Sequence, residues 1–169
     1  NKSNNIVSDN LISKVFINKE PHIPIWFLRQ AGRHIPEYFE IRKKETNFIN
    51  FCLNEDLIIK STCLPLKYYN LDAAIIFSDI LMIPWAMKRN VEFTKNFGPS
   101  MDPMIPNETK IVENISISSK LEPLKNSISF LRKKLPDSIA LIGFAGAPWT
   151  LACYMIEGKG SKDFIETRK

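Results

Sequence analysis

The chain has 169 residues, a formal charge of +5 from 23 basic and 18 acidic side chains, and 44% hydrophobic residues. These proportions are typical of a globular protein and exclude a globally disordered, collagen-like or low-complexity chain. No run approaches the roughly 18 apolar residues of a membrane span. The polar N-terminus has no apolar signal segment. We therefore expect neither membrane insertion nor secretion.

The first elements alternate between helix and strand. Apolar spacing predicts a short helix over residues 5–18. The short apolar and aromatic run 24–28 (PIWFL) predicts a buried strand. A helix is expected over 36–53, because Pro36 and Glu37 suit a first helical turn.

The middle of the chain continues this pattern. An amphipathic helix is expected over 55–69, where Pro65 should kink or end it. The run 72–77 (DAAIIF) predicts a strand that is buried on both faces. The Pro-rich segment 91–115 predicts an excursion loop or small hairpin with a strand-like stretch at Val91–Thr94.

The last part of the chain repeats the order of helix and strand. Leucine and isoleucine at spacings of three and four predict a helix over 118–135, which Pro136 stops. The run 139–144 (IALIGF) predicts a third buried strand, and a helix from about 149 to 157 follows it.

Short apolar strands separated by helices predict a parallel α/β fold with right-handed crossovers. A doubly wound sheet and a (β/α) barrel both fit this pattern. A complete (β/α)₈ barrel usually needs about 250 residues, which is more than this chain has. In either fold, ligands bind beyond the carboxyl ends of the strands, so candidate site residues follow each strand.

Two strands are followed by charged residues. Arg29 and Arg33, two of six arginines, follow 24–28, and their guanidinium groups suit carboxylate or phosphate recognition. Asp79 follows 72–77, where barrel enzymes keep catalytic groups. The alternatives are a structural ion pair for one arginine and a helix-capping role for Asp79.

The third strand is followed by a glycine-containing turn over 145–150 and by Tyr154. The turn matches neither common nucleotide-binding pattern, so a nucleotide site is not expected. Tyr154 could direct its hydroxyl at a ligand, although a lone tyrosine is more often a core residue with a solvated tip.

Metal, disulfide and nucleic-acid functions receive little support. His22 and His34 have no partner at ligand spacing, so no metal site is expected. Cys52, Cys63 and Cys153 are odd in number and lack a CxxC pair, which favours free thiols in a reducing cytosol. The lysines are scattered, which argues against a nucleic-acid interface.

Three segments resemble the uroporphyrinogen decarboxylase family, and they occur in the family's order. They are PIWFLRQAGRHIPEY, LDAAIIFSDILMIPWAM and IGFAGAPWTLACYMIEGKGSKDF. The first contains the family's R-Q-A-G-R signature, the second its F-S-D-I-L segment, and the third its P-W-T-L and E-G-x-G-S-K blocks. The resemblance covers the chain from about residue 7 to 169.

The resemblance implies a (β/α)₈ barrel that acts as a cytoplasmic homodimer without metal or organic cofactor. The family reaction decarboxylates the four acetate side chains of uroporphyrinogen III to give coproporphyrinogen III in haem synthesis. The resemblance implies binding neither to a nucleic acid nor to a membrane.

Carried over to this sequence, the resemblance assigns catalytic roles to Asp79, Arg29 and Arg33. Asp79 would accept the pyrrole N–H groups and stabilise a charged intermediate. The substrate-binding residues would be Arg29, Gln30, Ala31, Gly32, Arg33, Asp79 and Tyr154.

The family chain is about twice as long, so we expect residues 1–169 to be the N-terminal part of a single barrel domain. This part holds three to four of the eight βα units. Alone it is expected to be inactive, because the family's later pocket residues include a histidine and none follows His34. The alternatives are a corrinoid-linked methyltransferase relative, which uses a zinc site, and a truncated protein that only binds tetrapyrrole or a partner.

Overall fold

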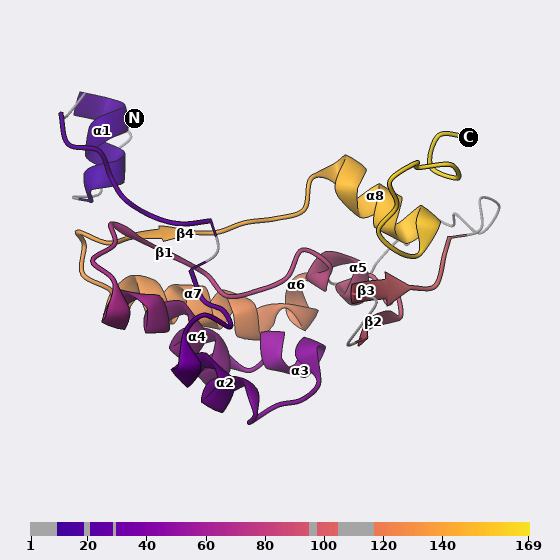
Figure 1. The fold of residues 1–169 in the computed structure, drawn as a ribbon, viewed down its shortest axis with the longest axis horizontal. Helices are drawn as coiled ribbons and strands as arrows, with labels where there is room; N and C mark the ends of the chain where they lie inside the picture. The colour runs from indigo at the N-terminus through magenta and orange to yellow at the C-terminus, as the bar shows by residue number, and fades with distance from the viewer. Residues whose placement is uncertain (1–9, 19–20, 29, 95–97, 105–116) are drawn as a thin grey trace. The chain divides into compact units, whose positions relative to one another are not determined.

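A computed structural model of the protein describes residues 10–18, 21–28, 30–94, 98–104 and 117–169, and its elements are those of a mixed α/β chain (Figure 1). The helices are α1 (Leu11–Asn18), α2 (Pro36–Arg42), α3 (Phe48–Cys52), α4 (Glu55–Tyr68), α5 (Met82–Ala86), α6 (Ile117–Lys120), α7 (Glu122–Lys134) and α8 (Pro148–Glu157). The strands are β1 (Ala73–Ile75), β2 (Val91–Thr94), β3 (Gly98–Met101) and β4 (Ala140–Ile142). The chain divides into two compact units. The first unit consists of Asn1–Phe77 and Leu124–Phe144, and the second consists of Ser78–Pro123 and Ala145–Lys169.

The first unit is built on the parallel pair of β1 and β4. Ala73 lies opposite Ala140, and Ile75 lies opposite Ile142. The N–H of Ile76 extends the pairing by donating to the carbonyl of Ile142 at 2.9 Å. The parallel strands predicted within 72–77 and 139–144 are therefore confirmed, but the run 139–144 is less buried than predicted, because Gly143 and Phe144 are exposed.

Helices α4 and α7 pack on the same side of this strand pair, as Figure 1 shows. Ile58 of α4 and Leu131 of α7 are fully buried beside Ala74 and Ile76 of the strand segment. Full burial of one such side chain stabilises the fold by about 2 kcal/mol. The apolar side chains that recur every three or four residues in these helices thus account for the way the helices cover the sheet.

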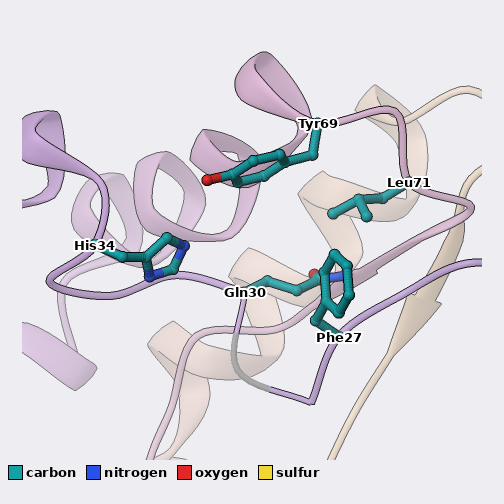
Figure 2. Close-up of a pocket in the computed structure, with 5 residues that line it drawn as sticks. All are labelled: Phe27, Gln30, His34, Tyr69 and Leu71. Carbon is teal, nitrogen blue, oxygen red and sulfur yellow. The ribbon is translucent and has the colours of Figure 1, made fainter.

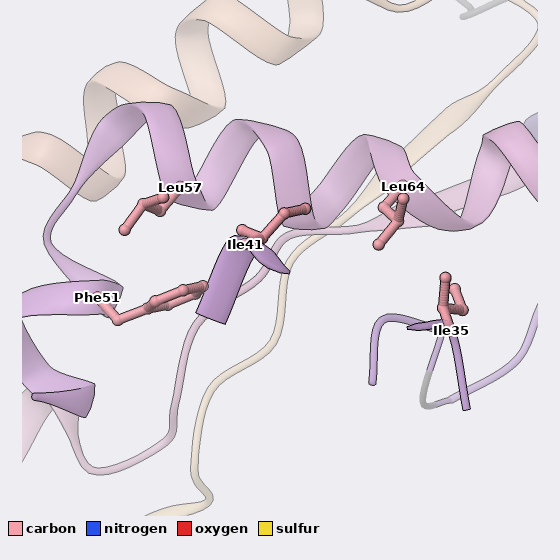
Figure 3. Close-up of a cluster of buried hydrophobic side chains, with 5 residues drawn as sticks. All are labelled: Ile35, Ile41, Phe51, Leu57 and Leu64. Carbon is pink, nitrogen blue, oxygen red and sulfur yellow. The ribbon is translucent and has the colours of Figure 1, made fainter. Parts of the chain in front are cut away.

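A second cluster joins α2, α3 and α4 and is shown in Figure 3. Its buried members are Ile35, Ile41, Phe51, Leu57 and Leu64. Ile35 precedes α2 and is 2% exposed, so it fixes the end of the loop that follows residues 24–28. This cluster therefore connects the core to a candidate site segment.

The prediction of one helix over 36–53 is wrong in its middle, where α2 ends and α3 begins. The guanidinium of Arg42 donates to the carbonyls of Glu45 and Thr46, which stabilises a turn in place of helix. The side chain of Asn47 then accepts the N–H of Asn50 at 3.0 Å and caps α3. Side chains that satisfy backbone groups locally thus interrupt the helix.

The helix predicted over 55–69 is confirmed as α4. The side chain of Asn54 caps it by accepting the N–H of Leu57 at 3.1 Å. Pro65 lies inside the helix and cannot donate to the carbonyl of Ser61. The helix nevertheless continues for three more residues and ends at Tyr68.

The helix predicted over 118–135 is divided at Leu121 into α6 and α7. Pro123 has no N–H with which to continue a helix from α6, but it suits the first turn of a new helix. The helix predicted from about 149 to 157 is confirmed as α8, and α1 lies within the predicted range 5–18. Residues 5–9 of that range lie outside the described residues.

The prediction of a buried strand over 24–28 is wrong, because the structure assigns no strand there and exposes most of the segment. Ile25 is 54% exposed and Leu28 is 79% exposed. The segment is attached at one point, where Ile25 donates its N–H to the Asp72 carboxylate at 2.7 Å and accepts the Asp72 N–H at 2.9 Å. Pro24 cannot donate to a ladder, and this single reciprocal pair does not make a strand.

The second unit contains the predicted hairpin. β2 and β3 are antiparallel, with Val91 opposite Met101 and Thr94 opposite Gly98. Residues 95–97 and 105–115 of the predicted segment 91–115 lie outside the described residues. The carbonyl of Gly158, just after α8, accepts the N–H of Met101 at 2.7 Å and holds the helix end to the hairpin.

No helix within the ranges that the structure describes is long and apolar enough to cross a membrane.

Candidate functional site

Asp79 lies in the loop that leaves β1 and leads to α5. Its Oδ1 accepts the N–H of Leu81 at 2.8 Å, which caps the turn before α5. Among the described residues, its other oxygen accepts no hydrogen bond, and the residue is half-buried. Burial raises the pKa of the Asp79 carboxyl, and the hydrogen bond from Leu81 partly offsets that effect. One carboxylate oxygen thus remains available to an N–H donor from a ligand.

The loop after residues 24–28 is anchored at both ends. The Gln30 side chain is 5% exposed and is hydrogen-bonded to the backbone of β1 through Ala73 and Ile75. At the other end, the N–H of Ile35 donates to the carbonyl of Gly32 at 3.1 Å. Between these anchors Arg33 is exposed, so its guanidinium is accessible to an anionic ligand.

Arg29, the other predicted arginine, lies outside the described residues, so its role stays a prediction. Ala31 and Gly32 are half-buried and lie between Gln30 and Arg33. The ideal Cβ of a side chain at Gly32 would lie 3.6 Å from the His34 ring, which is ordinary contact. Space therefore does not force a glycine at this position.

A pocket of about 350 Å³ lies beside this loop and is shown in Figure 2. It is lined by Phe27, Gln30, His34, Tyr69 and Leu71. The rings of His34 and Tyr69 stack with their centroids 6.2 Å apart. In Figure 2 the Tyr69 hydroxyl points toward the His34 end of the pocket. The pocket is therefore lined both by this loop and by the segment that enters β1.

The turn after β4 packs against the loop after β1. A Cβ built on Gly146 would lie 3.3 Å from Cβ of Ile80 and 2.5 Å from a methyl carbon of Leu151. A side chain here would require Leu151 to move and Ile80 to shift slightly, so glycine favours the close approach of the two loops. Since both loops follow strands, this contact brings together the segments in which ligand-binding residues were predicted.

Tyr154 is half-buried in α8, in the same unit as Asp79. A Cβ built on Gly160 would lie 3.5 Å from the Tyr154 hydroxyl oxygen. The segment after α8 therefore passes close to the tip of this side chain. Gln30, Ala31, Gly32 and Arg33 lie together in the first unit, whereas Asp79 and Tyr154 both belong to the second.

One buried contact near the site was missed by the sequence analysis. Thr62 of α4 accepts the N–H of Phe77 at 2.9 Å, two residues before Asp79, and donates to the carbonyl of Ile58 at 2.8 Å. A threonine within an amphipathic helix gives no signal for such a contact, because only the tertiary fold brings Phe77 to it.

The part of the chain that the structure describes contains no group of three or more histidine, cysteine, aspartate or glutamate side chains that could hold a metal ion. Cys52, Cys63 and Cys153 form no disulfide in the part of the chain that the structure describes. Burial raises the pKa of Cys63, which keeps this thiol in its less reactive protonated form.

Comparison with known proteins identifies relatives along nearly the whole chain. The family model described as uroporphyrinogen decarboxylase (URO-D) matches residues 8–169. A protein named uroporphyrinogen decarboxylase from Brucella anthropi is 46% identical over 145 residues, which are 86% of this chain and 42% of the relative. One of the same name from Brucella ovis is 44% identical over the same shares.

The chain thus spans less than half the length of these curated relatives. The matched region contains the loop with Gln30 and Arg33, the loop with Asp79, and α8 with Tyr154. On this match the chain belongs to the uroporphyrinogen decarboxylase family.

Proposed function

We propose that the protein containing this chain is a uroporphyrinogen decarboxylase. It converts uroporphyrinogen III to coproporphyrinogen III by removing carbon dioxide from four acetate side chains. The observation that carries the proposal is the family match across residues 8–169, supported by relatives of that name at 44% and 46% identity. From this match we infer that the protein acts as a carboxy-lyase in haem synthesis.

The proposed architecture is a (β/α)₈ barrel of which residues 1–169 supply the N-terminal three to four βα units within a single domain. The parallel pair β1–β4, covered on one side by α4 and α7, is consistent with two neighbouring units of such a barrel. The complete enzyme is proposed to be a homodimer in the cytoplasm.

Substrate recognition is assigned to the segment from Arg29 to Arg33. Uroporphyrinogen carries eight carboxylates, and guanidinium groups bind carboxylates through paired, charge-assisted hydrogen bonds. The exposure of Arg33 supports this role, because its charge is not consumed by a buried ion pair. Ala31 and Gly32 present a small surface that lets the macrocycle approach the backbone closely.

The central chemical role is assigned to Asp79. Loss of carbon dioxide from an acetate leaves an electron pair, and a protonated pyrrole of the substrate accepts it. No added cofactor is required for this step, because the substrate carries its own electron acceptor. The ionised Asp79 accepts the pyrrole N–H groups and stabilises their developing positive charge.

The environment of Asp79 supports this chemistry. Partial burial reduces the screening of its charge by water, so its attraction to a positively charged pyrrole is stronger than at an exposed site. The bond from Leu81 holds one oxygen in place and leaves the other for the substrate. Tyr154 is assigned a hydroxyl contact to the substrate from α8.

The substitution Asp79→Asn tests the central role. It keeps an oxygen for the Leu81 N–H but removes the negative charge, so we expect turnover to fall by about 100-fold or more. The measurement is the formation of coproporphyrinogen III by the complete protein that contains this sequence, followed chromatographically after oxidation to the porphyrins.

The matched control is Asp137→Asn, which removes a carboxylate that is 91% exposed and precedes β4 rather than following it. Its turnover should remain within about twofold of wild type, as for surface substitutions away from a site. Near-normal turnover in Asp79→Asn would remove Asp79 from the mechanism. Absence of product from the wild-type protein would overturn the proposed activity itself.

A further inference from the structure

The side-chain amide of Gln30 occupies the edge of β1 that faces away from β4. Its Nε2 donates to the carbonyl of Ala73 at 2.9 Å, and its Oε1 accepts the N–H of Ile75 at 3.1 Å. The opposite edge is used by β4, whose Ile142 carbonyl accepts the N–H of Ile76. The amide thus takes the place of a neighbouring strand for one donor and one acceptor of β1.

This bond pair is buried and joins parts of the chain that are distant in sequence. Gln30 is 5% exposed and lies 43 residues from Ala73. A buried amide is costly unless it is hydrogen-bonded, so the loop strongly favours the position in which both bonds form. Burial also leaves little of the Gln30 side chain for contact with a ligand.

The position of Arg33 follows from these anchors. Three residues after Gln30, its backbone lies between the clamp on β1 and the buried side chain of Ile35. The bond from Ile35 N–H to the carbonyl of Gly32 closes the turn in between. A short loop held at both ends keeps the exposed Arg33 at a fixed position above β1.

We propose that Gln30 is a positioning residue that fixes the substrate-recognising Arg33 by clamping its loop to β1. This inference rests on the proposed function and changes the role of Gln30 within it from direct contact to support. The geometry matters because recognition of a carboxylate by a guanidinium depends on the direction of the paired bonds. A displacement of about 1 Å in a binding group can change an enzyme's efficiency by a large factor.

Thr62 supplies a matched control on the same strand segment. It also hydrogen-bonds the backbone, accepting the N–H of Phe77 at 2.9 Å and donating to the carbonyl of Ile58, and both of these partners lie outside the loop at Gln30. Thr62→Val therefore loosens a buried bond without releasing Arg33. Gln30→Met removes both bonds of the clamp while preserving the length of the side chain.

The experiment compares KM and kcat for uroporphyrinogen III in the complete protein that contains this sequence. For Gln30→Met we expect KM to rise about tenfold and kcat to change by less than about threefold. Arg33→Ala should raise KM by at least as much, because it removes the guanidinium itself. Adding Gln30→Met to Arg33→Ala should then change KM by less than about twofold, since the clamp acts through Arg33.

Thr62→Val should lower the urea midpoint of unfolding but leave KM within about twofold of wild type. If Gln30→Met does not fold, Gln30→Glu replaces it, because its carboxylate still accepts the N–H of Ile75 but no longer donates to Ala73. Its expected KM lies between those of wild type and Arg33→Ala.

Three results would overturn the inference while the wild-type enzyme is active. They are an unchanged KM in a folded Gln30 variant, a full additional loss from Gln30→Met in the Arg33→Ala background, and an equal rise of KM in Thr62→Val. A wild-type protein without decarboxylase activity would instead overturn the proposed function, and the inference with it.

Discussion

Asp79 combines two demands that oppose each other in free energy. The proposed role needs its charge next to the substrate, yet partial burial removes water from that charge and raises the pKa of the carboxyl. The single bond from Leu81 offsets only part of this effect. A carboxylate held in this way is better suited to stabilising a cation than to stabilising the fold.

This reasoning gives a prediction for stability against pH. Because the pKa of Asp79 is higher in the folded state, its protonation favours folding at low pH, and that contribution is lost as the pH rises through the folded pKa. Asp79→Asn removes this dependence. We therefore compare the free energy of unfolding of the variant with that of wild type at two pH values. The difference, variant minus wild type, should be more positive at pH 7 than at pH 3, because pH 3 lies below the ordinary aspartate pKa of about 3.9.

Urea unfolding of both proteins at several pH values measures this difference. Comparison across pH cancels any constant effect of the new amide group. Asp137→Asn serves as the control, because it replaces a carboxylate that is 91% exposed by the same amide group. A difference that becomes more negative toward neutral pH would contradict the effect of burial on Asp79.

Single residues in the site were partly predictable from sequence. Arg33 and Asp79 were predicted because charged groups follow apolar runs, and their roles at a ligand stay predictions; Arg33 is exposed and Asp79 is half-buried. The clamp by Gln30 could not be predicted, because its partners Ala73 and Ile75 are backbone groups more than 40 residues away. Sequence patterns indicate side-chain chemistry but not such tertiary pairing.

At the scale of elements, the parallel strands within 72–77 and 139–144 were predicted, but the burial of 139–144 was not, because Gly143 and Phe144 are exposed. The strand predicted over 24–28 was wrong. The runs 72–77 and 139–144 pair with each other, so their apolar side chains are used in packing. The run 24–28 is also apolar, but among the described residues its hydrogen bonds to this part of the fold are those of Ile25 with Asp72. Composition alone does not reveal whether a partner strand lies beside an apolar segment.

The end of α8 gives a prediction at this scale. Gly158 has a φ of 74°, and a Cβ there would lie 2.7 Å from the Met101 carbonyl oxygen and 2.7 Å from Cγ of Pro103. Gly158→Ala should therefore destabilise the protein by about 2 kcal/mol, because a strained backbone and a steric clash act together. The measurement is the free energy of unfolding of the complete protein in urea.

Substitutions at two other glycines separate the effect of backbone strain from that of the steric clash. Gly98 has the same φ of 74° but no atom within 4 Å of its ideal Cβ, so Gly98→Ala should show the strain alone, about 1 kcal/mol. Gly143 has neither feature, so Gly143→Ala should change stability by less than about 0.5 kcal/mol. Equal losses at Gly158 and Gly98 would show that the helix end is not tightly packed on β3.

At the scale of the whole molecule, the contacts divide the chain into two units at positions that the sequence does not indicate. Each unit is made of two separate stretches of chain, and α7 begins at the boundary between them. No linker-like composition occurs at Phe77 or Phe144, where the chain passes from the first unit to the second. The division therefore arises from which apolar faces meet, not from local sequence.

A core substitution in the first unit tests whether the two units open independently. Leu131 is fully buried in the cluster that joins α4, α7 and β1, all of whose buried members belong to the first unit. Leu131→Ala should destabilise that unit by about 3 kcal/mol, because it leaves a cavity in a packed core. Hydrogen exchange of the complete protein should then accelerate at the amides of Ile76 and α4.

The amides of β2 and β3 provide the internal control, since their hairpin belongs to the second unit. If the units open separately, exchange in the hairpin should remain within about twofold of wild type. An equal acceleration in both would mean that these amides exchange through one cooperative opening. The substitution Ile128→Ala on the exposed face of α7, where the side chain is 40% exposed, should leave both regions nearly unchanged.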